Sequence, residues 1–271
     1  MDVIATPTSL ETPVDRTVPS PQHEVLREIT RGGLAGLIVG VVLAGVGGRL
    51  VMRLAALLVP SADGAFTENG NRIGDITLGG SLGIIVFIGL FFGAVAGSLW
   101  VIIRRWLPSS RTARLVVTIP IAVALGTPGL IEARNRDFDI LQHDPLVVAS
   151  LVVLVALFGP ALVLVDAWLD RRLPQPTPDD GKVINGFGTV AFIGLLLTMF
   201  LVVPMFLGSS LRPAGLALLV VGVVTMIAWW YRVEGKASPP AWLPTVARLG
   251  LVAAVLGGMA VTVREVLGAL E

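Results

Sequence analysis

Two arginines, Arg49 and Arg53, interrupt an otherwise apolar segment near the start of the chain. They are four residues apart, so they share one face of a helix. A guanidinium in a hydrocarbon environment is costly and commonly marks a pathway or a binding site. The pair can therefore hold an anion or a carboxylate, or it can extend along the helix to the lipid headgroups.

A six-residue phrase, Asn-Arg-x-x-Asp-Ile, occurs twice, at 71–76 and at 135–140. Asn and Asp favour turns and helix caps, so both copies can begin a helix. In a helical turn the charged members would also form i,i+3 ion pairs, Arg72 with Asp75 and Arg136 with Asp139. The functional alternative is that the two copies converge into one polar pocket.

Further acidic residues surround the second copy, among them Glu132 and Asp137. Two carboxylates and the imidazole of His143 could hold a divalent cation, but Asp-x-Asp is too common to predict one. No catalytic motif, cofactor or metal is predicted, and an enzyme is the less favoured class. The candidate ligand-binding residues are Arg49, Arg53, Arg72, Asp75, Glu132, Arg136 and Asp139.

The composition decides which elements must position these residues. Hydrophobic residues make up 54% of the 271 and charged residues only 14%, whereas about 25% is usual in soluble domains. Uncharged apolar stretches are long enough to cross a hydrocarbon layer about 30 Å thick. We predict an all-α, polytopic transmembrane bundle whose environment is the lipid bilayer. A net charge of +1 gives no reason to expect a nucleic-acid partner.

We divide the chain into a disordered tail (1–22), an amphipathic lead-in (23–32) and a transmembrane domain (33–271). Apolar segments predict seven spans in the transmembrane domain, near 33–58, 78–103, 115–132, 146–168, 187–208, 214–231 and 246–264. Pro128, between Gly126 and Gly129, predicts a break in the third span. Asp144-Pro145 predicts the capped start of the fourth.

Basic residues are distributed unevenly between the two sides of this bundle. One side holds Arg16, Arg27, Arg31, Arg104, Arg105, Arg111, Arg114, Arg171, Arg172, Lys182, Arg232, Lys236 and Arg248, and the other holds Arg72, Arg134, Arg136, Arg212 and Arg264. The excess predicts a cytoplasmic N-terminus and an external C-terminus. The preference for arginine over lysine is typical of GC-rich bacterial genomes, which indicates a bacterial cytoplasmic membrane.

Internal likeness extends beyond the repeated phrase. Spans two and four both exit through Trp, Arg-Arg and Leu-Pro, which indicates repeated two-helix hairpins related by an axis along the membrane normal. Small residues at four-residue steps predict close helix packing or self-association with a second copy or another membrane protein. These stripes are Gly40, Ala44 and Gly48; Gly89, Gly93 and Gly97; and Gly250, Ala254 and Gly258.

Three functions remain open at this stage. The first is binding or transport of a small polar or anionic solute at an outer-side site between spans one to four. The second is a non-catalytic accessory or scaffold protein. The third is a lipid-processing enzyme that uses the outer carboxylates. The two membrane arginines favour the first, whereas the lack of an acid deep in a span favours the second.

The predicted orientation is testable because the chain has no cysteine. We expect a single cysteine at residue 70 to react with an impermeant thiol reagent on intact cells. A cysteine at residue 110 should stay protected until the membrane is permeabilised. The opposite pattern would reverse the orientation.

Overall fold

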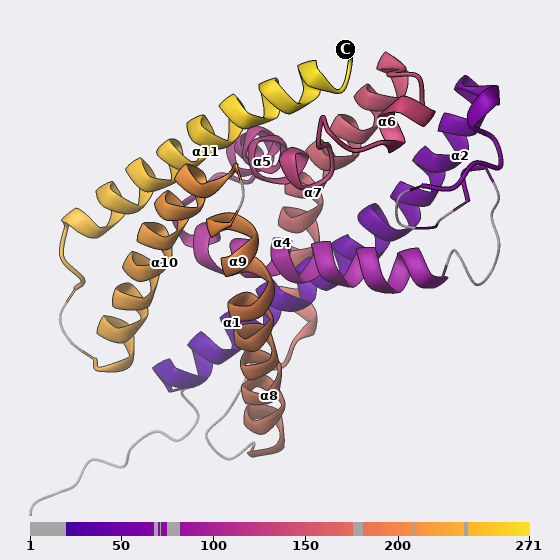
Figure 1. Ribbon diagram of the computed structural model, residues 1–271. Coiled ribbons are helices and arrows are strands. Elements are labelled where there is room, and N and C mark those ends of the chain that lie inside the picture. Colours follow the sequence, from indigo (N-terminus) through magenta and orange to yellow (C-terminus); the bar gives the residue numbers. More distant parts are fainter. Residues whose placement is uncertain are drawn as a thin grey trace, which may run out of the picture.

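The computed structural model describes residues 20–67, 70, 72–74, 82–175, 181–208, 210–235 and 238–271. This part of the chain is mostly helical and holds no β-strand, only one isolated bridge between Phe66 and Arg72. Seven helical stretches in it are long and apolar enough to cross a membrane, which confirms the predicted all-α bundle (Figure 1). They are Pro21–Leu58, Ile85–Trp106, Arg111–Gly129, Pro145–Arg172, Gly181–Phe200, Arg212–Val233 and Trp242–Gly268.

Several shorter helical segments accompany or join the seven spans. The first span comprises α1 (Pro21–Val39), the π-helical η1 (Gly40–Gly47) and α2 (Gly48–Leu58), and the second comprises the π-helical η3 (Ile84–Ile88) and α4 (Gly89–Ile103). After η4 (Arg104–Trp106) come α5 (Arg111–Gly126), η5 (Thr127–Gly129), α6 (Asp137–Ile140) and α7 (Pro145–Arg172). The last spans are α8 (Gly181–Leu197) with η6 (Thr198–Val202) and α9 (Val203–Leu207), then α10 (Arg212–Val233) and α11 (Trp242–Gly268).

The two ends of the bundle are easily distinguished in Figure 1. The end of α2, the short α6 and the C-terminus lie together at one end, and the start of α1 lies toward the other. Following the predicted orientation, we name the end with α6 the outer end and the opposite one the inner end.

The first helix differs from its prediction. The segment predicted as a lead-in, 23–32, belongs to Pro21–Leu58, which is one continuous helical stretch of 38 residues. At 1.5 Å per residue it is about 57 Å long, well beyond a hydrocarbon layer of about 30 Å, so it must tilt or project from the membrane. The sequence obscured this continuity because polar residues near the start of the stretch resemble a surface segment.

The third span ends earlier than predicted. Pro120 is accommodated inside α5, and the helix gives way to the 3₁₀ turn η5 at Thr127, so Glu132 lies beyond the span. Pro128 therefore ends the helix instead of breaking it in the middle. The predicted cap of the fourth span is confirmed, since Asp144 Oδ1 accepts hydrogen bonds from the amides of Leu146 (2.8 Å) and Val147 (3.1 Å).

Glycines allow α1 and α4 to cross in backbone contact. A Cβ atom added to Gly36 would lie 2.2 Å from Cα of Gly97, and one added to Gly40 would lie 2.3 Å from Cα of Gly93. Real Cβ atoms do not approach this closely, so no larger residue fits without separating the helices. The hydrophobic effect does not drive helices together in lipid. Close backbone contact stabilises the pair through van der Waals attraction instead.

Most of the small-residue stripes pack against other helices of the same chain. Gly89, Gly93 and Gly97 all face the first span, and Gly258 lies against the backbone oxygen of Ala124 in α5. These faces are occupied within the chain, so they are not free for self-association. The stripe predicted for span one is only partly right, because Gly48 has no described atom within 4 Å of a Cβ position.

The two copies of Asn-Arg-x-x-Asp-Ile differ in conformation. Arg72 pairs with Phe66 in an antiparallel bridge, whereas Arg136 has right-handed helical angles at the start of α6. Asn71 and Asp75 lie outside the described residues. The prediction that the two phrases adopt equivalent turns is wrong at the arginines, so the phrase does not support an internal repeat.

The glycine crossing predicts a steep dependence on side-chain size. We expect Gly36→Ala to lower the midpoint of thermal unfolding in detergent by several degrees, because overpacking costs about 1–3 kcal/mol or more. Gly33→Ala is the matched control, since a Cβ there meets no described atom within 4 Å. Equal midpoints for the two variants would contradict the close crossing.

Candidate functional site

A cavity of about 730 Å³ lies among the first four spans. Residues of the first span, of η3 and α4, of α5 and of α7 line it, together with both outer connections. Its volume is within the range of roughly 300–1,000 Å³ that is usual for small-molecule pockets. The sequence predicts a ligand site between the same four spans.

The walls of the cavity are apolar, and two wide helical turns shape them. The larger side chains include Phe91, Phe92, Leu125, Leu151, Leu154 and Phe158. Ala44 of η1 and Ile88 of η3 also line the space, so both π-helical segments face it. Turns of this kind are rare and often occur at functional sites. Gly48 adds room, because it contributes no side chain to the lining.

The inner end of the cavity is closed. Trp100, Ile103 and Leu162 form a floor there, with only 1%, 4% and 7% of their surface exposed. Thr118 and the indole of Trp100 are the polar exceptions. The Thr118 hydroxyl donates to the carbonyl oxygen of Leu115 in the same helix (3.0 Å), whereas Nε1 of Trp100 is buried and has no hydrogen-bond partner among the described residues. The floor therefore offers a bound molecule mainly apolar contact.

The outer end of the cavity is polar. Thr67, Asn135 and Asp137 contribute to the lining there. The amide of Asp137 donates to Oδ1 of Asn135 (2.7 Å), which fixes the start of α6 beside the opening. The cavity thus combines a long apolar interior with a hydrogen-bonding mouth.

Arg49 lies beside this cavity and is buried, with 6% of its surface exposed. Its Nη1 lies 3.6 Å from Sδ of Met52, a residue of the cavity wall. Arg53, one turn further along α2, is exposed and donates from Nη1 to the carbonyl oxygen of Gly74 (2.8 Å). Both guanidiniums therefore make contacts within the protein.

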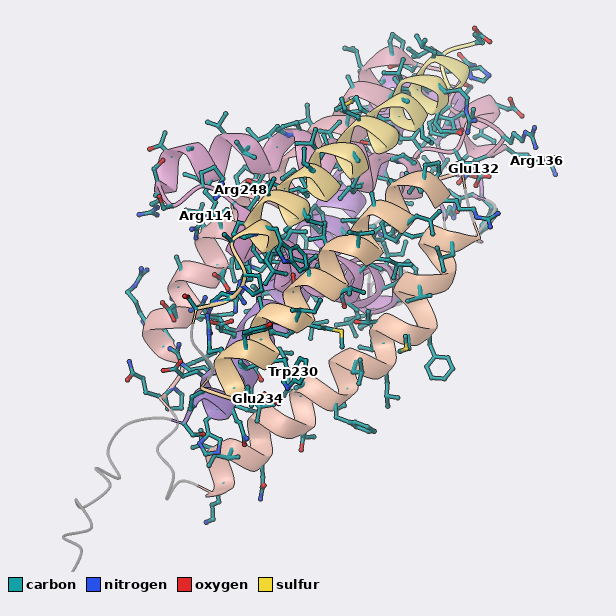
Figure 2. All side chains as sticks on the ribbon, turned by 90° about the vertical axis from the view of Figure 1, so that its left-hand side faces the viewer. Arg114, Glu132, Arg136, Trp230, Glu234 and Arg248 are labelled. Carbon is teal, nitrogen blue, oxygen red and sulfur yellow. The ribbon has the colours of Figure 1, made fainter. Side chains whose placement is uncertain are left out.

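The remaining predicted site residues do not gather at one point. Arg72 donates from Nε to the carbonyl oxygen of Gly64 (3.3 Å), and Asp75 lies outside the described residues. Glu132 is exposed at the outer end, away from Trp230 (Figure 2). Arg136 and Asp139 border a second, smaller cavity of about 320 Å³, and Thr67 belongs to both cavities. Figure 2 shows Arg136 projecting from the outer end of the molecule.

His143 is held by the C-terminal segment. Its Nδ1 lies 2.9 Å from the carbonyl oxygen of Ala269, and its Nε2 lies 3.4 Å from Oδ1 of Asp139. Across the described residues, no group of three or more acidic, histidine or cysteine side chains is placed to hold a metal ion. His143 therefore links the turn after α6 to the end of α11.

A group of charges at the inner end was not predicted as a site. Nη1 of Arg104 donates to Oδ1 of Asp166 (2.8 Å), and the two side chains are only 7% and 8% exposed. Nε of Arg31 reaches the same carboxylate oxygen (3.0 Å). Arg31 also pairs with Asp170, which accepts from Nη1 of Arg27 as well (2.8 Å). We call these five residues the ionic clamp.

A neighbouring carboxylate extends the same group toward α10. Oε1 of Glu28 accepts from Nη1 of Arg232 (2.7 Å), and its Oε2 accepts from Nε1 of Trp229 (3.3 Å). The carbonyl oxygen of Glu28 accepts from Nη2 of Arg104 (2.7 Å). Helices α1, α7 and α10 and the end of the second span therefore meet through charged side chains at the inner end.

The signal for the clamp was present in the sequence. Asp166 is an acid within an apolar span, and Arg104 follows the second span directly. Basic residues are expected at cytoplasmic helix ends whatever their partners, so Arg104 alone predicts no site, and Asp166 lies near the inner end of its span and not deep in it. Only the packing of α1 against both α4 and α7 reveals that they face each other.

Comparison of the chain with protein-family models, with curated proteins and with solved structures gives no match. The fold and its sites define a seven-span α-helical membrane protein.

The two acids of the clamp differ in burial, so we expect their substitution to lower the stability of the protein by different amounts. Asp166→Asn leaves two guanidiniums facing a neutral amide, and breaking a buried ion pair costs about 3–5 kcal/mol. Asp170 is 49% exposed, so Asp170→Asn should cost at most about 1 kcal/mol. Thermal unfolding in detergent should rank the two variants in this order, and equal losses would contradict the burial of the Arg104–Asp166 pair.

Proposed function

We propose that this protein binds an amphiphilic molecule of the membrane, with the apolar part in the large cavity and the polar headgroup at the outer mouth. The observation that carries the proposal is the 730 Å³ cavity with apolar walls and floor and with Thr67, Asn135 and Asp137 at one end. The sequence suggested a small polar or anionic ligand. In this proposal, only the headgroup of the bound molecule has that character.

The physical reason is that an apolar cavity of this size is unfavourable when empty. Its lining loses dispersion contacts, and water gains little by entering because it finds few hydrogen-bond partners. A hydrocarbon chain restores those contacts. Since lipid tails are as apolar as the cavity, transfer of a chain gains little hydrophobic free energy, so shape and headgroup contacts must provide the selectivity.

The polar groups at the mouth suit a headgroup that both donates and accepts hydrogen bonds. Asp137 is an acceptor when ionised, Asn135 offers both functions, and Arg49 lies one residue from Gly48 of the cavity wall. A charge balanced by groups of both signs favours a zwitterionic or hydroxylated headgroup over a simple anion. In this proposal the protein lies in the cytoplasmic membrane with the mouth toward the outside.

The test is to fill the cavity and measure the bound amphiphile. Native mass spectrometry of the protein, extracted gently from phospholipid vesicles, should detect one retained phospholipid per chain. Gly48→Phe places a ring in the cavity and should abolish retention. Gly188→Phe is the matched control, because Gly188 lies in α8, outside the cavity lining, and a Cβ there meets no described atom within 4 Å.

Two outcomes would contradict the proposal. One is the absence of a retained phospholipid in the unmodified protein. The other is equal retention in Gly48→Phe and Gly188→Phe, which would place the lipid on the outer surface of the bundle.

A further inference from the structure

Four spans surround the large cavity, and three of the four seams between neighbouring spans are closed. The first span is joined to α4 by the glycine crossing. It also packs on α7 along its length, where a Cβ on Gly47 would lie 2.5 Å from Cδ1 of Leu154. Helix α5 is closed against α7, since a Cβ on Gly159 would lie 2.2 Å from the carbonyl oxygen of Thr118. A molecule cannot enter the cavity through any of these three seams.

The fourth seam, between the second and third spans, is different. Helix α4 packs on the first span and α5 packs on α7 and α11, whereas α4 and α5 have little direct contact in the described part of the chain. In Figure 1, α4 extends across the view and α5 is seen nearly end-on, so the two helices diverge. Two residues of the cavity lining are exposed, Phe87 of η3 and Gly129 of η5, and the others are buried or half-buried. The cavity therefore reaches the surface of the bundle between η3 and η5.

This lateral opening lies toward the outer end of the bundle. Phe87 is two residues after the start of the second helical stretch, Ile85–Trp106, and Gly129 is the last residue of the third, Arg111–Gly129. Both stretches are long and apolar enough to cross a membrane. Phe87 is 78% exposed, and Leu90, about one helical turn further on, is exposed as well. The rim of the opening therefore faces the hydrocarbon of the outer leaflet and not water.

We propose that the cavity receives a lipid of the outer leaflet, whose acyl tail passes sideways between η3 and η5. This inference rests on the proposed function. Asn135 and Asp137 follow Gly129 in the chain and line the polar end of the cavity, so the headgroup can stay at the membrane surface while the tail moves inward. The tail then remains in apolar surroundings throughout, and the unfavourable transfer of its methylene groups into water is avoided. The ligand is accordingly a lipid resident in the bilayer and not an amphiphile delivered through water.

The opening can be obstructed with a bulky maleimide on a single cysteine, since the chain has no cysteine of its own. Phe87→Cys places the label at the rim, and the exposure of Phe87 makes the site accessible in the purified protein. Leu90→Cys is the matched control, because Leu90 is exposed on the same span but does not line the cavity. Phe66→Cys, beside Thr67 of the polar mouth, tests the alternative route from water.

The measurement is the rate at which the retained phospholipid exchanges for a deuterated phospholipid. Native mass spectrometry follows the exchange in mixed detergent–phospholipid micelles, whose apolar belt covers the membrane-facing surface of the protein. We expect the label at residue 87 to slow the exchange severalfold, and the labels at residues 90 and 66 to leave the rate of the unmodified protein. Gly129→Cys, labelled in the same way, obstructs the opening from the opposite rim and should also slow the exchange.

The possible outcomes separate this inference from the binding proposal. Slower exchange with the label at residue 66, but not at residues 87 or 129, would overturn the lateral opening and assign entry to the polar mouth. Equal rates in all the labelled variants, with the phospholipid still retained, would also overturn the lateral opening and leave the binding proposal intact. The absence of a retained phospholipid in the unmodified protein would instead refute the binding proposal.

Discussion

The buried ion pair between Arg104 and Asp166 is the contact on which the arrangement of the first four spans depends. A guanidinium and a carboxylate that are each less than one tenth exposed cannot be hydrated, so each needs the other. Their pairing brings the inner ends of α4 and α7 together, and Arg31 adds α1 to the same carboxylate. Helices tied at one end in this way can diverge toward the other, which leaves room for the cavity between them.

The glycine crossing complements this constraint. Because α1 and α4 touch through Gly36 and Gly97, they behave as one wall whose shape does not depend on flexible side chains. The π-helical segments η1 and η3 lie in the same wall, where Cα of Ile85 would be 2.9 Å from a Cβ on Gly45. The rigid contact between these helices and the ion pairs beneath the cavity floor can keep the cavity open when no molecule is bound.

The two ends of the cavity differ in polarity. Its floor is formed by Trp100, Ile103 and Leu162, and its opposite end by Asn135 and Asp137 beside α6. An amphiphile entering headgroup last would match both ends, whereas a uniformly polar solute would face unpaired apolar surface along most of its length. The shape and the polarity of the site therefore point to the same class of ligand.

The sequence by itself determined what depends on composition and local chemistry. Apolar segments define the seven spans, and Asp144 before Pro145 defines the start of α7, because span length and capping involve only nearby residues. Only the tertiary structure decided that Gly36 meets Gly97, that Asp166 meets Arg104, and that a cavity lies above them. Such pairings join residues more than 60 positions apart, and they are selected by helix packing, which local sequence patterns do not encode.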